Sequence, residues 1–354
     1  MSDIKNKIDS PLYRYISEFL EYCEIGKNQS RNTILAYHRY LHKFLNFVLP
    51  LGIKDPKDID LETVKKYRLY LNRLTDDKGN SLKLITQNYH LIALRAFLKY
   101  LAKQDIPTLS GEKIELPKSP QRQVEFLEKD ELDRLFLAIA GEKDELQRLR
   151  DSAILQTLFS TGLRVSELAS LKIESINLDR REFTVRGKGS KLRLVFLSDE
   201  AAETIKKYLS KRKDNSKALF VGHSEIGQSS PTSGKIADKG KKIVAEQKKI
   251  EKEIASQEYG KNDNNKNNHN KASGLTVRQI QRIIKKYCRI AGIIKKVTPH
   301  TLRHSFATDL LQNGADIRSV QTLLGHASIT TTQIYTHITN QGLRDIHKKF
   351  HNKK

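Results

Sequence analysis

The sequence of 354 residues has little cysteine, no long apolar run and fewer acidic than basic side chains. Its two cysteines, Cys23 and Cys288, each fall in a predicted helix, which is typical of small core residues and excludes a disulfide scaffold. No apolar stretch approaches the length of a membrane-spanning helix, and the first ten residues, MSDIKNKIDS, lack the apolar core of a signal peptide. We therefore expect a cytoplasmic protein that does not enter a membrane.

The shortage of acidic residues sets the charge, because 41 Asp and Glu stand against 64 Lys and Arg, a formal net charge of +23 at pH 7. A fold does not require this imbalance, and it costs self-repulsion between like charges. A polyanionic partner would balance it, and nucleic acid is the usual one. An anionic membrane surface would also fit the charge, but the lack of a long apolar run favours nucleic acid.

The length predicts two domains. Residues 11–103 carry four apolar stripes at helical spacing and no strand signal, which predicts a helical domain over 1–115. The stretch 116–126 contains prolines and has no periodicity, as is typical of an extended linker, so the second domain would span 127–354. Basic side chains on the polar faces of the first domain are either solvated or bound to phosphates: Arg39, Lys43, Lys65, Lys66, Arg68, Arg95 and Lys99.

The second domain mixes helices with a little β-structure. Two β-type runs flank a glycine-containing turn in 182–197, which predicts a hairpin. Residues 223–273 are rich in Lys, Asn, Ser and Glu, which is typical of a surface insertion that is either solvated or in contact with DNA. The predicted class is therefore mainly α with a small β-hairpin or sheet. Helices are predicted at 129–141, 147–160, 199–212, 276–291, 299–313, 316–324 and 328–338.

The segment TPHTLRHSFATDLL, residues 298–311, predicts an anion site at the start of a helix. Thr298 is a suitable N-cap and Pro299 suits the first helical position. His300 and Arg303 are three residues apart and share a face near the free N–H groups of that helix end. An arginine fork matches two phosphate oxygens, and a histidine can donate or transfer a proton.

A zinc site is the alternative for this helix, because His300 and His304 are four residues apart. The zinc-protease motif requires Glu directly after the first histidine, and this chain has Thr301 there. The guanidinium of Arg303 would also repel a metal cation. We therefore expect no metal, and interpret His304 as a structural hydrogen-bonding group.

Two further segments contain candidate phosphate ligands. In STGLRVSELASL, residues 160–171, Arg164 follows a glycine turn, and Glu167 lies three residues on, where it could orient the guanidinium. Such pairs are usually surface decoration. In RGKGSKLR, residues 186–193, Lys188 stands between two glycines at the hairpin tip, where it is either a solvated turn residue or a proton donor.

The segment LLGHASITTTQIYTHI, residues 323–338, places His326 nine residues before Tyr335. The three threonines 330–332 are poor helix formers, so the predicted helix should be marginal and movable. A tyrosine in such a place is usually a half-buried packing residue. It is also a possible nucleophile toward a phosphodiester if arginines and imidazoles neutralise the charge that develops.

Taken together, these motifs resemble the tyrosine recombinases of the phage integrase family, and among them the Xer-type enzymes. TGLRVSEL, the GKGSK hairpin, TPHTLRHSFATDLL and LLGHASITTTQIYTH follow one another in the family's order. The resemblance covers nearly the whole chain. The insertion at 223–273 is the main departure, because Xer-type proteins usually have a short loop there.

The resemblance implies that Tyr335 attacks a scissile phosphate, forms a 3′-phosphotyrosyl link and releases a 5′-hydroxyl. Lys188 would be the general acid for the departing oxygen. The bond energy is conserved in the phosphotyrosine, so neither a nucleotide cofactor nor a metal would be required.

The remaining candidates would stabilise the transition state. Arg164 and Arg303 would hold the non-bridging phosphate oxygens, and Glu167 would keep Arg164 in place. His300 and His326 would add hydrogen bonds and transfer protons.

The resemblance also implies the assembly. Two domains would form a C-shaped clamp around double-stranded DNA at a dif-like site, and a tetramer would exchange strands through a Holliday junction. The tetramer would contain this chain alone or a second Xer recombinase as well, and the tail 343–354 would dock on a neighbour. A role for an FtsK-type translocase stays open.

Three alternatives remain beside chromosome-dimer resolution at segregation. The protein could be the integrase or excisionase of a mobile element, although nothing before residue 11 suggests the extra DNA-binding domain of such enzymes. It could be a non-catalytic DNA-binding protein, but every expected position carries the expected residue type. It could also be a type IB topoisomerase, which relaxes DNA without recombining it.

Overall fold

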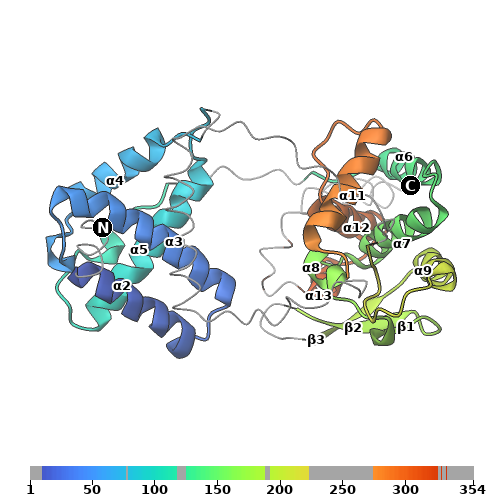
Figure 1. Cartoon of the computed structure of the whole chain (residues 1–354), viewed down its shortest axis with the longest axis horizontal. Coiled ribbons are helices and arrows are strands. Elements are labelled where there is room, and N and C mark those ends of the chain that lie inside the picture. Colours follow the sequence, from blue (N-terminus) through green and yellow to red (C-terminus); the bar gives the residue numbers. More distant parts are fainter. Residues whose placement is uncertain are drawn as a thin grey trace, which may run out of the picture. The chain divides into compact units, whose positions relative to one another are not determined.

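The computed structural model describes residues 10–76, 79–117, 125–187, 192–222 and 274–325, together with 328 and 332. It divides into two compact units, Met1–Arg122 and Gln123–Lys354 (Figure 1). The centre of the predicted linker, the hairpin tip, the insertion at 223–273 and nearly all of the segment after Gly325 lie outside the described residues.

The first unit is helical, apart from an isolated bridge between Thr75 and Ser81. Its second and third long helices begin directly after Ser30 and Asp60, whose side chains each accept a hydrogen bond from the backbone N–H three residues on. The α-helices are α2 (Pro11–Glu21), α3 (Arg31–Val48), α4 (Leu61–Arg73) and α5 (Leu84–Lys103), with a π-turn at Tyr22–Gly26 and 3-10 turns at Leu49–Leu51, Pro56–Asp58 and Gly111–Lys113.

The core of this unit is built from the four predicted apolar stripes. Phe19 of α2, Leu41 of α3 and Leu94 of α5 are at most 1% exposed. Tyr67 of α4 is fully buried, and its hydroxyl forms a hydrogen bond of 3.0 Å with Nδ1 of His90 on α5. A hydrogen-bonded polar pair therefore lies among the buried apolar side chains of the bundle.

The second unit combines helices with a three-stranded antiparallel sheet of order β1-β2-β3. The predicted hairpin is its larger part, and Phe183 of β2 lies opposite Val195 of β3. The strands are β1 (Ile176–Asn177), β2 (Glu182–Arg186) and β3 (Leu192–Phe196). The helices are α6 (Lys129–Ala140), α7 (Glu145–Thr161), α8 (Val165–Ala169), α9 (Asp199–Lys211), α11 (Val277–Ile290), α12 (Pro299–Gln312) and α13 (Ile317–Leu324), with a 3-10 turn at Ile173–Ser175.

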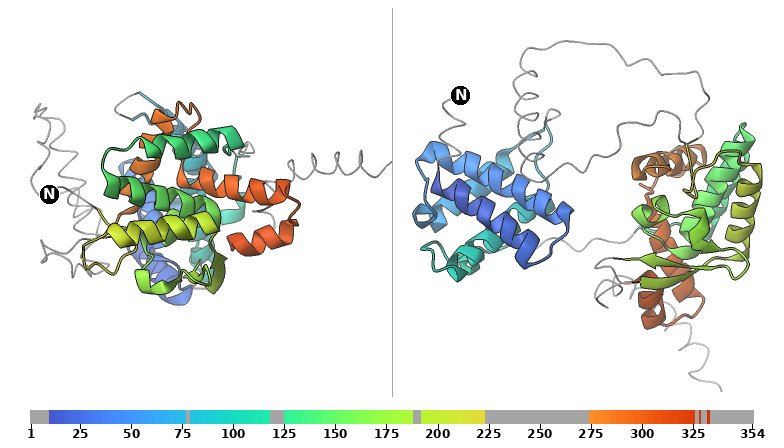
Figure 2. Two further views of the ribbon diagram at one scale, coloured as in Figure 1. Left: turned by 90° about the vertical axis from the view of Figure 1, so that its right-hand side faces the viewer. Right: turned by 60° about the horizontal axis from the view of Figure 1, so that its bottom comes forward.

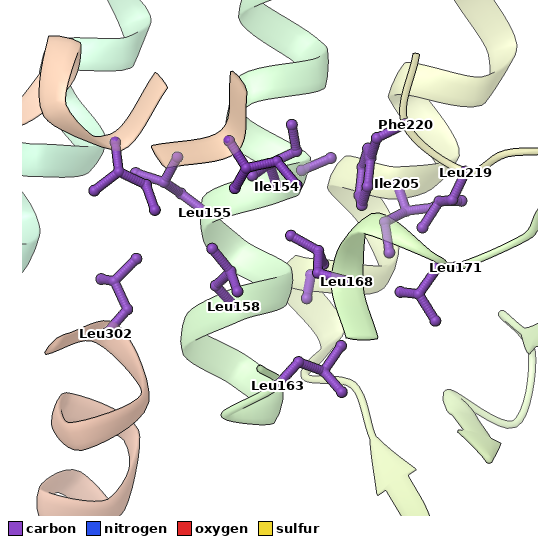
Figure 3. Close-up of a cluster of buried hydrophobic side chains, with 14 of the residues drawn as sticks. Ile154, Leu155, Leu158, Leu163, Leu168, Leu171, Ile205, Leu219, Phe220 and Leu302 are labelled. Carbon is purple, nitrogen blue, oxygen red and sulfur yellow. The ribbon is translucent and has the colours of Figure 1, made fainter. Parts of the chain in front are cut away.

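Helix α7 is the centre of this unit, with α6 on one side and α9 on the other (Figure 2). Its side chains Ile154, Leu155 and Leu158 are fully buried and meet side chains from α8, α9 and α12 (Figure 3). Contact with α12 brings the end of α7 to the start of the segment in which the sequence predicts an anion site.

None of the helices in the described part of the chain has both the length and the apolar character needed to span a bilayer.

Candidate active site

The end of α7 is shaped by a glycine that the site requires. Gly162 has φ of +58°, and a Cβ there would lie 2.5 Å from Cδ1 of Phe306 and 3.0 Å from Cδ2 of Leu324. Only glycine combines this backbone conformation with so close an approach. The chain then turns through buried Leu163 into Arg164, which is the N-cap of α8.

Arg164 and Glu167 form the pair that the sequence suggested, and the carboxylate lies inside the protein. Nη1 of Arg164 donates to Oε1 of Glu167 at 2.9 Å, and the backbone N–H of Arg164 donates to Oε2 at 2.8 Å. Glu167 is 8% exposed, whereas the Arg164 side chain is 29% exposed. The carboxylate therefore orients a guanidinium that still reaches the surface.

Helix α12 begins as predicted. The side chain of Thr298 accepts from the N–H of Thr301, and Pro299 occupies the first helical position. Arg303 on this helix is only 4% exposed. Its guanidinium donates through Nη1 to the carbonyl of Gly162 at 2.5 Å and through Nη2 to that of Leu324 at 2.6 Å.

The two arginines converge on consecutive carbonyls at the C-terminal end of α13. Leu324 accepts from Arg303, and Gly325 accepts from Nη2 of Arg164 at 3.4 Å. Carbonyls at a helix C-terminus lack partners within the helix and carry partial negative charge, so they attract cations. His326 is the next residue along the chain, so the segment that contains His326 and Tyr335 begins beside both guanidiniums.

The surroundings of the two histidines of α12 favour the uncharged imidazole. Partial burial, followed by the charges of Arg303 and Arg164, lowers the pKa of His300 below its ordinary value. Burial, followed by the charges of His300 and Arg303, lowers the pKa of His304 to about 4. A neutral imidazole at His300 can accept a proton or donate its N–H.

Three predicted site residues, Lys188, His326 and Tyr335, lie outside the described part of the chain. The residues brought together are Arg164, Glu167, His300 and Arg303. The sequence motifs predicted no role for Arg193, whose guanidinium on β3 also binds Glu167.

The profile of the phage integrase family matches residues 125–341, and that of the phage integrase N-terminal SAM-like domain matches residues 16–105. The chain therefore belongs to the phage integrase family, as its motifs predicted.

Among the members of this family, the chain is similar to tyrosine recombinases of the Xer type. Tyrosine recombinase XerD of Listeria monocytogenes serotype 4b is 32% identical over 345 residues, which cover 95% of this chain and 98% of the relative. Tyrosine recombinase XerC of Thermodesulfovibrio yellowstonii is 31% identical over 340 residues, which cover 95% and 96%.

A solved structure of the XerH site-specific recombinase, bound to a palindromic difH substrate in a post-cleavage complex, has a TM-score of 0.63 at 23% identity. The match covers 94% of this chain and 83% of the XerH chain. The match confirms the predicted fold class, mainly helical with a small sheet.

Proposed function

We propose that this protein is a site-specific tyrosine recombinase, which cuts and rejoins DNA through a covalent phosphotyrosyl intermediate and resolves chromosome dimers at segregation. The convergence of Arg164 and Arg303 on the end of α13 is the observation that carries the proposal. These residues are far apart in the sequence, yet their guanidiniums bind neighbouring carbonyls next to the segment that contains Tyr335. The Xer names of the relatives support the same activity.

The arginines would stabilise the transition state of phosphoryl transfer. Attack on a phosphodiester makes a five-coordinate phosphorus whose non-bridging oxygens gain negative charge. Two guanidiniums fixed before the substrate arrives can bind these oxygens without further reorganisation. Arg164 is held by Glu167 and Arg303 is held by backbone carbonyls. His300 would add a hydrogen bond to the phosphate.

The covalent steps involve residues outside the described ranges. The phenolic oxygen of Tyr335 would attack phosphorus and pass its proton to a neutral histidine of the site, His300 or His326. The bond to the 5′-oxygen would break, with Lys188 donating a proton to that leaving group. His326 would assist by hydrogen bonding. Attack by the 5′-hydroxyl of a partner strand would then reverse the chemistry and release the tyrosine, so no external energy source is consumed.

The larger assembly follows from strand exchange. Two duplexes carry four strands to be cut, so four active sites act in one tetramer, of one or two recombinase types, and its intermediate is a Holliday junction. The net charge of +23 supports binding to double-stranded DNA, here a dif-like chromosomal site in the cytoplasm. An FtsK-type translocase would supply the signal that links exchange to segregation.

Trapping of covalent protein–DNA adducts tests this function. Wild type, Tyr335→Phe and the control Tyr89→Phe are incubated with fragmented host DNA, and denaturant-resistant complexes are isolated and sequenced. Tyr89 is a suitable control because it is a surface tyrosine, 48% exposed, of the first unit. Adducts with wild type and the control but not with Tyr335→Phe, focused on one near-palindromic site, are the expected result.

Other outcomes point elsewhere. An adduct that persists in Tyr335→Phe would exclude Tyr335 as the nucleophile. Scattered adducts would favour a topoisomerase, and a site at the ends of a mobile element would favour an integrase. If wild type gives no adduct even after host extract is added, the proposed activity is wrong.

A further inference from the structure

Arg193 forms an ion pair with Glu167 beside the site, and it lies outside the motifs that predict catalytic residues. It lies on β3 opposite Val185, and its side chain is 10% exposed. Nη1 donates to Oε1 of Glu167 at 2.9 Å, and Nη2 donates to Oε2 at 2.7 Å. This is a two-bonded arginine–carboxylate fork in a buried place, which is the strongest form of such a pair.

Glu167 is thereby shared between two arginines. Arg193 supplies two of its hydrogen bonds, and Arg164 supplies two more through its backbone N–H and Nη1. Burial by itself raises the pKa of Glu167, but the hydrogen bonds from Arg193 and then Arg164 outweigh burial and lower this pKa to about 2. A carboxylate with four donors cannot rotate without losing some of them, so its orientation is fixed.

Arg193 also packs against the end of α13. Gly325 has φ of +64°, and a Cβ there would lie 2.8 Å from Cδ of Arg193. The carbonyl of the same glycine accepts from Arg164. One side chain thus contacts the carboxylate that orients Arg164 and the residue that directly precedes His326.

We propose that Arg193 is a positioning residue for the recombinase reaction: its fork locks Glu167, and Glu167 in turn holds the guanidinium of Arg164 where it meets the scissile phosphate. The inference rests on the proposed function. Arg193 is given no contact with DNA, because both of its terminal nitrogens are bound to a charged carboxylate, whereas those of Arg303 are bound to neutral carbonyls. Arg164, with 29% of its side chain exposed, presents the guanidinium that faces the substrate.

The experiment compares Arg193→Gln with Arg193→Lys and with a matched control, Arg181→Gln. Arg181 pairs with Asp199 beside the same sheet and does not touch Glu167. The substrate is a nicked duplex of the site recovered by adduct trapping, which accumulates the covalent complex. Single-turnover cleavage and DNA affinity are measured separately for each variant.

Cleavage by Arg193→Gln should fall about 10- to 100-fold, by analogy with the loss of residues that orient metal ligands. Arg193→Lys, which keeps the charge but not the fork, should be intermediate, and Arg181→Gln should match wild type. DNA affinity should stay within about twofold of wild type for all three. The acid limb of the cleavage rate should move to higher pH in Arg193→Gln, because Glu167 loses the donors that lower its pKa.

An Arg164→Lys background separates positioning from a general structural effect. If Arg193 acts through Arg164, Arg193→Gln should cost much less in that background, because there is no guanidinium left to position. An equal loss in both backgrounds would overturn the proposal. So would a loss of DNA affinity with a shallower salt dependence, which would identify Arg193 as a phosphate contact.

A measurement without DNA tests the contact between Arg193 and Glu167 independently of the proposed function. Urea unfolding of the full chain is followed for Arg193→Gln, Glu167→Gln and the double variant. If the double variant loses less free energy of unfolding than the two single variants lose in sum, the result would support the lock on Glu167. This would hold even if wild type formed no adduct and the recombinase proposal failed. Strictly additive losses would overturn the lock, whatever the DNA results were.

Discussion

The guanidinium of Arg303 donates a hydrogen bond of 2.5 Å to the carbonyl of Gly162, two residues before Arg164. This contact joins the two arginine motifs through the backbone, so a displacement of one motif moves the other. Arg303 is 4% exposed and its second donor goes to Leu324, which ties the end of α13 to the same point. The geometry of the site therefore depends on close packing at Gly162 as well as on the charged residues.

Gly162→Ala should damage both stability and cleavage. The new methyl group would meet Phe306 at 2.5 Å and would force a left-handed backbone conformation, φ +58°, on a residue with a side chain. We expect a loss of more than about 2 kcal/mol in the free energy of unfolding, from strain and overpacking together. Urea unfolding and single-turnover cleavage on the trapped site measure the two effects.

Gly292→Ala is the matched control for that experiment. Gly292 has φ of +65°, but a Cβ there would have no atom within 4 Å. It should cost only the backbone term, about 1–2 kcal/mol, and leave cleavage unchanged. If both variants lost the same stability and the same activity, packing at Gly162 would not be what fixes the site.

Arg303→Lys should abolish most cleavage while the protein stays folded. An ammonium group can replace the positive charge, but it lacks the planar fork that binds the carbonyls of Gly162 and Leu324 together. We expect the rate to fall about 100- to 1,000-fold, as for loss of a preorganised oxyanion donor. Arg134→Lys on the surface of α6 is the control, since the Arg134 side chain is 50% exposed and pairs with Asp130 of the same helix. Wild-type cleavage by Arg303→Lys would contradict the role given to the fork.

Much of this site could be predicted because its motifs are local. The cap at Thr298, the proline after it and the spacing of Arg164 and Glu167 follow from rules that act within one helical turn. The carbonyl partners of Arg303 could not be predicted in this way, since Gly162 and Leu324 are brought to it only by tertiary packing.

The role of Arg193 was missed for a related reason. Alternation along β3 would put Leu192, Leu194 and Phe196 in the core and Arg193 in solvent. The structure has the reverse, with Leu192 66% exposed and the Arg193 side chain 10% exposed. The face of β3 that carries Arg193 also carries Val195, which is 3% exposed in the core, and on this face Arg193 meets the buried carboxylate of Glu167. Sequence periodicity carries no information about such a distant carboxylate.

Each exposed basic side chain of the first unit should contribute separately to phosphate binding. Lys65 on α4 is exposed, whereas Lys99 on α5 already binds Glu112 at 3.1 Å. Lys65→Ala should therefore lower the salt dependence of DNA binding by about one charge, and Lys99→Ala should change it much less. Salt titrations of affinity for a short random-sequence duplex measure this slope. Equal slopes for the two variants would show that the ion pair does not withhold Lys99 from DNA.

His90 should make the first unit sensitive to acid. Burial, followed by the charge of Lys43, lowers the pKa of His90 to about 4, although a backbone hydrogen bond opposes this shift. In the unfolded chain His90 binds a proton near pH 6.5, whereas in the folded chain His90 stays neutral until about pH 4. The unfolded state therefore takes up more protons in this window, and stability falls as the pH drops through it. The expected loss from this group is about 2 kcal/mol between pH 8 and pH 5.

Urea unfolding of the full chain across pH 4–8 tests that sign with two variants of one buried pair. His90→Gln cannot titrate, so its stability should be lower at pH 8 but should fall less steeply toward pH 5. Tyr67→Phe removes the hydroxyl that contacts Nδ1 of His90 at 3.0 Å but leaves the ring buried. It should lose stability at every pH and keep the wild-type slope, because burial is the main cause of the lowered pKa. The pKa of His304 in the second unit is lowered as well, so His304 also destabilises the protein as the pH falls. His90→Gln should therefore remove only part of the dependence of stability on pH. An unchanged slope in His90→Gln would mean that His90 binds its proton over the same pH range in the folded and unfolded states, so the buried pair would be charged at pH 5.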